Sequence, residues 1–344
     1  MKLSFNIPTY NRAKYLRKSL ELIMSQIEEL HVEESVEVNL SDNASTDNTK
    51  EVWYECVSRH PKIKTCYHCN DHNLGPDRNF LAAMKMANGD YSLLWGDDDY
   101  LKEGGLNRIF ELIEYGEKND VQIMLSSTSI IDEDGNYLSE KLFLRDDIKE
   151  FFVDFSDLSQ VRSYFFLLRD MGGLLSFISD VIYKTSIIHE MPYHDEFTGT
   201  HYAFLCYWWG WLAKGKKLYY SSKSFLNETI QYQPAYGYGV KRSMVDYNGY
   251  YIIFDRLIKD QPFGRDFLNA FLNLHDDILL RQIYIPERNA FETNIIPMLR
   301  KYHRESDKLT FLVNSCKKKR VTKEFVFSIM PQRMIKLIKD YCKR

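Results

Sequence analysis

The chain has 344 residues, of which 44% are hydrophobic and 15% aromatic, and it carries a formal net charge of −3 at pH 7. This composition excludes an intrinsically disordered protein, and the length allows one large hydrophobic core or two modest ones. We expect no nucleic-acid partner.

The ends of the chain and its cysteines bear on the compartment. The apolar N-terminal stretch runs directly into Pro8, so it is too short for a secretory signal peptide. The most apolar later window, residues 203–213, is far below the roughly 20 residues of a membrane-spanning helix. Cys66 and Cys69 lack the second pair of a structural zinc site, which favours a strand there. We therefore expect a cytoplasmic protein, either free or peripheral at the inner membrane face.

The first 126 residues alternate between strand and helix patterns. Apolar residues at helical spacing predict a helix after each of the first four strands, and the third helix starts near Pro76. This alternation predicts an α/β fold with a mostly parallel sheet, whose polar loops gather at the carboxyl ends of the strands. The strands are predicted at residues 3–7, 36–40, 63–69, from 91, and 121–126.

The pattern changes after residue 130. Asp134-Gly135 predicts a turn between two strands, and Gly172-Gly173 predicts a flexible joint. Further elements are a helix at 158–168, a strand at 177–184, a helix at 200–213 and a closing edge strand at 218–221. Beyond residue 239 the pattern is helical, with segments at 247–257, 267–284, 290–302 and 322–341. We place a domain boundary near residue 235.

Three consecutive carboxylates, Asp97, Asp98 and Asp99, follow the strand that starts at residue 91. Adjacent carboxylates repel one another, so folding gains nothing from placing them at the end of a buried strand. Either they form a solvated turn, or they bind a hard cation that takes oxygen ligands. The absence of a GxGxxG motif after the first strand argues against a dinucleotide-binding dehydrogenase, and the absence of GxxxxGK[ST] excludes a P-loop enzyme. A nucleotidyltransferase is disfavoured because residues 8–12 are not a glycine-rich phosphate loop.

Four polar segments occur in a fixed order: IPTYNR at 7–12, SDNASTDNT at 41–49, NLG at 73–75 and GDDD at 96–99. Together they resemble family 2 glycosyltransferases of the GT-A fold, closest to the abequosyltransferase-like branch of bacterial polysaccharide-synthesis enzymes. The resemblance implies a Rossmann-like, mostly parallel sheet, a nucleotide-sugar donor, Mn²⁺ or Mg²⁺, and an inverting transfer to a glycan or lipid-linked acceptor. It divides a catalytic domain of residues 1–235 into a nucleotide-sugar-binding half (1–130) and an acceptor half (131–235).

The resemblance also implies residue roles. Asp98 becomes the direct metal ligand, Asp99 orients it, and Asp97 contacts the sugar or ribose. Gly96 stands where many relatives have an aspartate, which leaves the ligand register open by one residue. Donor binding falls on residues along the same edge: Pro8, Thr9, Tyr10, Arg12, Asp42, Asn43, Asn73, Gly75, Asn79 and Asp97.

The acceptor side is less well defined. An inverting enzyme needs a general base to take the proton of the acceptor hydroxyl. The family places a Glu-Asp pair at the start of the helix that we expect near Thr200, and this chain has no such pair there. The nearest alternatives are Asp195, Glu196 and His201, with Asp180 on the preceding strand as a further one. The missing pair also permits another hypothesis, a non-catalytic carbohydrate- or partner-binding protein of the same fold.

The C-terminal region, residues 236–344, is predicted to be helical with a basic amphipathic tail. From Arg300 onward there are 14 lysines and arginines against four acids, which leaves 31 against 44 in the first 299 residues. This tail is predicted to bind a membrane surface; the alternative is that it packs on its own domain or on a second copy in a homodimer. Two other clusters are predicted to be structural. The tryptophans at 208, 209 and 211 are assigned to the core rather than to sugar stacking, and His275 with its two following acids to a solvated helix face.

Overall fold

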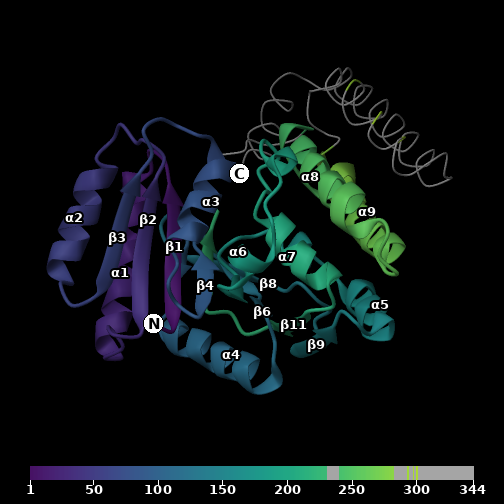
Figure 1. Ribbon diagram of the computed structural model, residues 1–344, viewed down its shortest axis with the longest axis horizontal. Coiled ribbons are helices and arrows are strands. Elements are labelled where there is room, and N and C mark those ends of the chain that lie inside the picture. Colours follow the sequence, from purple (N-terminus) through teal and green to yellow (C-terminus); the bar gives the residue numbers. More distant parts are fainter. Residues whose placement is uncertain (231–239, 283–292, 294–296, 298–299, 301–344) are drawn as a thin grey trace, which may run out of the picture. The chain divides into compact units, whose positions relative to one another are not determined.

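The computed structural model describes residues 1–230 and 240–282, together with residues 293, 297 and 300 (Figure 1). Two compact units are distinguished, residues 1–234 with 248–274 and residues 235–247 with 275–344. The boundary near residue 235 stays a prediction. The basic tail after residue 300, the helix predicted at 322–341 and all but three residues of the helix predicted at 290–302 lie outside the described residues. Among the described helices, none combines the length and the apolar character needed to cross a membrane.

In the described part, the larger sheet has eight strands in the order β3-β2-β1-β4-β10-β6-β11-β9. The pairs β1–β2, β2–β3, β1–β4 and β6–β11 are parallel, whereas β10 and β9 run antiparallel to their neighbours. The predicted mostly parallel sheet is therefore confirmed. The bounds are β1 (Leu3–Thr9), β2 (Val36–Asp42), β3 (Lys64–Cys69), β4 (Tyr91–Leu94), β6 (Ile123–Ser126), β9 (Glu150–Asp154), β10 (Val181–Lys184) and β11 (Lys217–Ser221).

The helices of the first half follow the predicted apolar spacing. In α1 (Ala13–Glu29) the buried stripe contains Leu16, Leu20, Ile23 and Ile27. The chain passes from β1 through β2 to β3 in one direction, then returns past β1 to β4. Since such crossovers are right-handed, α3 (Pro76–Lys85) covers the face opposite α1 and α2 (Thr49–Arg59). The reversal makes the carboxyl ends of β1 and β4 the topological switch point, where ligands bind in such folds.

A smaller four-stranded sheet was not predicted. Its order is β5 (Tyr100–Leu101), β12 (Leu226–Thr229), β7 (Thr128–Ile131) and β8 (Tyr137–Lys141). The predicted turn at residues 134–135 is confirmed, because it joins β7 to the antiparallel β8. The sheet begins at β5, directly after the Asp triplet, and so ties the triplet to the second half of the chain.

Two predicted elements are corrected. The strand at 218–221 is not an edge strand, because β11 lies between β6 and β9, and β9 forms the edge. The half-exposed β9 has no clean alternation to reveal it. The helix expected to start at residue 200 starts at Leu205 (α7, Leu205–Ala213), because residues Gly199 and His201 have φ of 91° and 64°. Both values lie in the left-handed region, which no α-helix continues through.

The second half is held by an aromatic core. The tryptophans at 208, 209 and 211 are at most 1% exposed, which confirms their assignment to the core. Trp209 packs on Phe267 at a ring-centroid distance of 4.6 Å and stacks on Phe165 at 6.3 Å. These rings come from three helices far apart in sequence. The remaining described helices are α4 (Gly105–Asn119), α5 (Leu158–Leu167), α6 (Ile187–Glu190), α8 (Val240–Ile253) and α9 (Gly264–Gln282), with the short 3₁₀ helices η1 (Met171–Leu174) and η2 (Asp195–Phe197) and the π-helical segment η3 (Phe254–Ile258).

The prediction that His275 lies on a solvated helix face is wrong. Its side chain is fully buried, and Nε2 lies 3.1 Å from Oδ2 of Asp246. The ring also packs on Tyr247 at a centroid distance of 4.5 Å. A histidine followed by two acids is typical of an exposed helix face. Here Asp246 on α8 is the polar partner that allows the histidine to be buried.

Gly172 lies in a tightly packed turn, η1, and not in the flexible joint that was predicted. A Cβ at Gly172 would come within 2.3 Å of the ring of the fully buried Phe143. We expect Gly172→Ala to lower the free energy of unfolding by about 1–3 kcal/mol, because the core has no room for one more carbon. Urea denaturation measures this loss. Ser163→Ala on the exposed side of α5 is the control and should stay within about 0.5 kcal/mol; an equally small loss at Gly172 would contradict the packing.

Candidate active site

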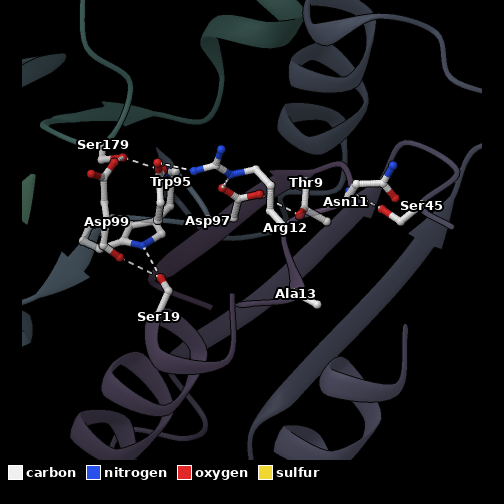
Figure 2. A network of polar contacts seen from close by, with 12 residues as sticks. Thr9, Asn11, Arg12, Ala13, Ser19, Ser45, Trp95, Asp97, Asp99 and Ser179 are labelled. Atoms are coloured by element: carbon white, nitrogen blue, oxygen red, sulfur yellow. Dashed lines mark hydrogen bonds and ion pairs between the residues drawn. The ribbon is translucent and has the colours of Figure 1, made fainter. Parts of the chain in front are cut away.

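The carboxyl ends of β1 and β4 bring four predicted site residues together (Figure 2). Thr9, the last residue of β1, donates its hydroxyl to Oδ2 of Asp97 at 2.6 Å. The guanidinium of Arg12 donates from Nε to Oδ1 of Asp97 at 2.7 Å and also forms an ion pair with Asp98. The sequence separates Arg12 from the triplet by more than 80 residues, and the parallel pairing of β1 with β4 closes that gap.

The charge of this cluster is unbalanced. Asp97 is 5% exposed, and burial raises its pKa above the ordinary value, with the charge of Asp98 acting in the same direction. The nearby Arg12 opposes both effects but supplies only one positive charge for three carboxylates. Three adjacent carboxylates with one arginine beside them at a sheet edge favour either the uptake of protons or a bound cation or cationic group.

Asp99 is turned away from Arg12, into the protein. Its Oδ2 accepts a hydrogen bond from the hydroxyl of Ser179 at 2.6 Å, and its carbonyl accepts one from Ser19 at 2.8 Å (Figure 2). This placement suits the orienting role predicted for Asp99. The position of the Asp99 side chain also favours glycine at residue 96, because a Cβ there would lie 2.5 Å from Oδ2 of Asp99. Any side chain at position 96, such as the aspartate that the resemblance leads one to expect, would therefore require the Asp99 carboxylate to shift.

Asp42 ends β2, next to the switch point. Its Oδ1 accepts the backbone N–H of Ser45 at 2.9 Å, and its Oδ2 accepts the hydroxyl of Tyr67 at 2.8 Å. Tyr67 on β3 was not predicted as a site residue, although its place in an alternating strand could have suggested it. Tyr10 is 41% exposed beside this strand end, so its ring is free to meet a planar ligand.

Asparagines connect the loops around the switch point. Asn43 donates to the carbonyl of Gly75 at 3.3 Å and to the side chain of Asn73 at 2.9 Å. The amide of Asn79 donates to the carbonyls of Thr9 at 3.3 Å and Ser41 at 3.0 Å. Because the Asn79 side chain is 3% exposed and engaged by backbone, it joins β1 to β2 and positions the loop that would meet a donor. Pro8 belongs to the buried strand β1.

The three predicted bases lie on one stretch after α6. Asp195 has an 88% exposed side chain, 3.9 Å from Arg78, and Glu196 forms an ion pair with Arg256 at 3.0 Å. His201 lies in the turn of residues 199–203, which precedes α7. The structure therefore separates an exposed acidic pair from a histidine whose backbone is fixed by the fold.

A second cluster of charged side chains was only partly anticipated. Asp180, adjacent to β10, is fully buried, and neither of its carboxylate oxygens has a hydrogen-bond partner. Lys141 on β8 lies 3.1 Å from Glu228 on β12 and 3.9 Å from Asp170. Burial raises the pKa of Asp180 well above its ordinary value, and Lys141 acts against this shift. No motif marks Lys141 or Glu228, since both stand in the sheet that the sequence did not predict.

Asp180 gives a pH-dependent prediction. Because its pKa is higher in the folded than in the unfolded chain, its contribution to stability is present below the unfolded pKa and is lost as pH rises toward the folded value. The slope reaches at most about 1.4 kcal/mol per pH unit. We expect Asp180→Asn to flatten the decline of the unfolding free energy above pH 4, measured by urea denaturation across a pH series. Parallel curves for variant and wild type would contradict the assignment.

The triplet fits Mn²⁺ or Mg²⁺ in one specific way. Within the described residues no three histidine, cysteine or acidic side chains are arranged as a complete metal site. Asp98 presents a 26% exposed carboxylate next to Asp97. Mg²⁺ is typically held by one or two carboxylates together with substrate phosphates, so Asp98 beside a diphosphate is a suitable donor set.

A family model described as glycosyl transferase family 2 matches residues 4–171. These residues form a family 2 glycosyltransferase domain. The domain contains β1, the Asp42 loop, the Asn73–Gly75 loop and the Asp triplet, so it includes every residue predicted for donor and metal binding. It ends before Asp195, Glu196 and His201.

Two curated relatives match a similar share of the chain. Abequosyltransferase RfbV of Salmonella typhimurium is 33% identical over 207 residues, which are 59% of this chain and 58% of the relative. The GalNAc(5)-diNAcBac-PP-undecaprenol beta-1,3-glucosyltransferase of Campylobacter jejuni is 26% identical over 218 residues, 63% of this chain and 62% of the relative. The matched stretch spans less than two thirds of the length of either relative.

Solved structures extend the likeness of the fold beyond the domain. TarS 1-349 of S. aureus superposes with a TM-score of 0.64 at 16% identity, covering 96% of this chain and 92% of that one. The mannosyltransferase PcManGT of Pyrobaculum calidifontis gives a TM-score of 0.52 at 15% identity, covering 93% and 87%. At such identities the likeness concerns the fold alone. It confirms the predicted GT-A architecture, with helices following the α/β part.

Proposed function

We propose that this chain is a metal-dependent, inverting glycosyltransferase. In this proposal it moves a sugar from a nucleotide-sugar donor to a hydroxyl of a glycan or lipid-linked acceptor during surface polysaccharide synthesis. The observation that carries the proposal is the convergence of Thr9, Arg12, Asp97 and Asp98 at the switch point of a family 2 domain. Two relatives named for sugar transfer support the class of reaction, and one of them is named for an undecaprenol-linked acceptor.

The donor-binding roles follow from the geometry at the strand ends. Tyr10 would stack on the nucleobase, and Asp42 would accept a base N–H in addition to its hydrogen bond from Tyr67. Thr9 and Arg12 would meet the ribose and the diphosphate, since both already surround Asp97. Structures of TarS in complex with UDP-GlcNAc and of PcManGT in complex with GDP-Man and Mn²⁺ support a nucleotide-sugar ligand for this fold.

Asp98 would hold the divalent cation, with Asp99 fixing the loop behind it. When bound, the cation would neutralise negative charge on the diphosphate leaving group. Arg12, Thr9 and Asp97 form the part of the site that this chain supplies itself. Arg12 is oriented by two carboxylates and stays close to where a diphosphate would lie, so it would add a fixed positive charge there.

The transfer requires one bond to form as another breaks. The acceptor oxygen attacks the anomeric carbon, the bond from that carbon to the phosphate oxygen breaks, and the base receives the hydroxyl proton. We assign the base role to His201. Glu196 is paired with Arg256, and Asp195 is mostly exposed, whereas the backbone of His201 is held in a fixed turn.

A thermal-shift screen with UDP-, GDP-, dTDP- and CDP-sugars tests the donor proposal. A sugar nucleotide at 100 times its dissociation constant should add about 2.7 kcal/mol of stability, and the shift should require Mn²⁺. A chain that binds none of them would contradict the proposal. Product formation with the selected donor, lost in His201→Ala, would separate an enzyme from the alternative of a non-catalytic carbohydrate-binding protein.

A further inference from the structure

One carboxylate binds the turn that carries His201. Asp77, in the first turn of α3, is 2% exposed. Its Oδ2 accepts the backbone N–H groups of Gly199 at 2.7 Å and His201 at 3.0 Å, and its Oδ1 accepts that of Ala203 at 3.0 Å. The backbone N–H groups of three alternate residues thus converge on one side chain, and that side chain belongs to the first half of the chain.

The turn depends on this carboxylate for its shape. Gly199 and His201 both have positive φ, a conformation that is unfavourable for a residue with a Cβ such as His201. Hydrogen bonds to a charged acceptor are stronger than those to a neutral one, so Asp77 can offset the cost of this backbone. An asparagine in its place would offer one acceptor oxygen and would turn an N–H₂ group toward a backbone N–H.

The start of α3, which carries Asp77, is also attached to the donor-binding loops. Gly75, two residues before Asp77, accepts a hydrogen bond from Asn43, which directly follows Asp42. Two residues after Asp77, Asn79 donates to the carbonyl of Thr9 at the end of β1. The start of α3 is therefore fixed to the donor side by its neighbours and to the acceptor turn by Asp77.

We propose that Asp77 is a positioning residue, which holds the acceptor turn of residues 199–203 against the donor-binding half. The inference rests on the proposed function, because it is the assignment of His201 as the general base that places this turn at the active site. Asp77 touches neither substrate nor reacting atoms in this proposal. It sets where His201 stands relative to a donor that is bound by Thr9, Asp42 and Asp98.

The test compares Asp77→Asn with Asp71→Asn, which removes the same charge from an exposed position six residues earlier. In Asp77→Asn, amide hydrogen exchange of peptides spanning 196–205 should accelerate about tenfold or more. With the sugar nucleotide selected by the thermal-shift screen, kcat for donor hydrolysis should fall about 10- to 100-fold, because a small misplacement of a catalytic group has this effect. The dissociation constant of that nucleotide should change less than about twofold, and Asp71→Asn should match the wild type.

Gly199→Ala is the second variant, should Asp77→Asn fail to fold. The φ of 91° at Gly199 is unfavourable for a residue with a Cβ, yet a Cβ added there would have no atom within 4 Å. The substitution therefore disturbs the turn without a clash with α3. It should reproduce the loss of kcat with unchanged nucleotide affinity. Unchanged exchange in Asp77→Asn, or faster exchange with normal hydrolysis, would overturn the proposal. If no nucleotide binds the wild type, the proposed function fails, whereas the exchange comparison still decides whether Asp77 holds the turn.

Discussion

Asp98→Asn is expected to abolish Mn²⁺-dependent nucleotide binding and to lower sugar transfer about 10³-fold or more. The amide keeps the shape of the side chain but removes the charge that would hold a cation beside the diphosphate. The fold should survive, because the Asp98 side chain is 26% exposed and Arg12 keeps its contact with Asp97. Isothermal titration of the selected nucleotide with and without Mn²⁺, together with turnover, measures the effect.

Asp134→Asn is the matched control, since Asp134 is exposed in the β7–β8 turn. It should bind the nucleotide and turn over like the wild type. Undiminished Mn²⁺ dependence in Asp98→Asn would assign the cation to another residue, and a loss of folding would make the triplet a structural element. Either result would contradict the role that we give to Asp98.

Lys141→Met is expected to produce a large loss of stability. The substitution leaves Glu228, Asp170 and the buried Asp180 without the cation that lies among them. Removing one partner of a buried ion pair costs roughly 3–5 kcal/mol. Because the side chains of Lys141 and Glu228 are 29% and 22% exposed, we expect a loss near the low end of that range. Urea denaturation at pH 8 measures it.

The loss in Lys141→Met should shrink between pH 8 and pH 4. Burial raises the pKa of Asp180, so lowering the pH protonates this group and removes negative charge that the variant leaves uncompensated; the unfolding free energies of variant and wild type then approach each other. Lys118→Met on the exposed side of α4 is the control for removing a positive charge. An equal loss in both variants, or a loss that grows at low pH, would show that Lys141 does not balance these acids.

The donor half could be predicted because its signals are local. The spacing of Leu16, Leu20 and Ile23 predicts the buried face of α1, and polar residues directly follow the predicted strands. In a parallel sheet those strand ends meet at one edge, so Thr9 and Asp97 were expected to be neighbours. The donor-binding role of Asn79 stays a prediction, and the structure adds that its amide donates to two strand carbonyls and so holds the loops together.

The second half depends on contacts that no local pattern encodes. The small sheet pairs β5 with β12, across more than 120 residues, and its strands are too short to show an alternation. The Gly172 turn was mistaken for a joint because a glycine pair is typical of flexible segments, whereas here Phe143 occupies the space that a side chain would need. The contacts of Asp77 likewise have no local signal, because its hydrogen-bond donors in residues 199–203 lie more than 120 residues away in the sequence.

The central claim is that the Asp triplet holds a donor diphosphate through a cation, beside a nucleoside site at Asp42. A crystal structure with the selected nucleoside diphosphate and Mn²⁺ tests it most directly, because Mn²⁺ can be located by its anomalous scattering. We predict a Mn²⁺ peak in contact with Asp98 and the diphosphate, and a base against Asp42 and Tyr10. A Mn²⁺ peak elsewhere, or a nucleotide that contacts neither Asp42 nor Thr9, would contradict the account.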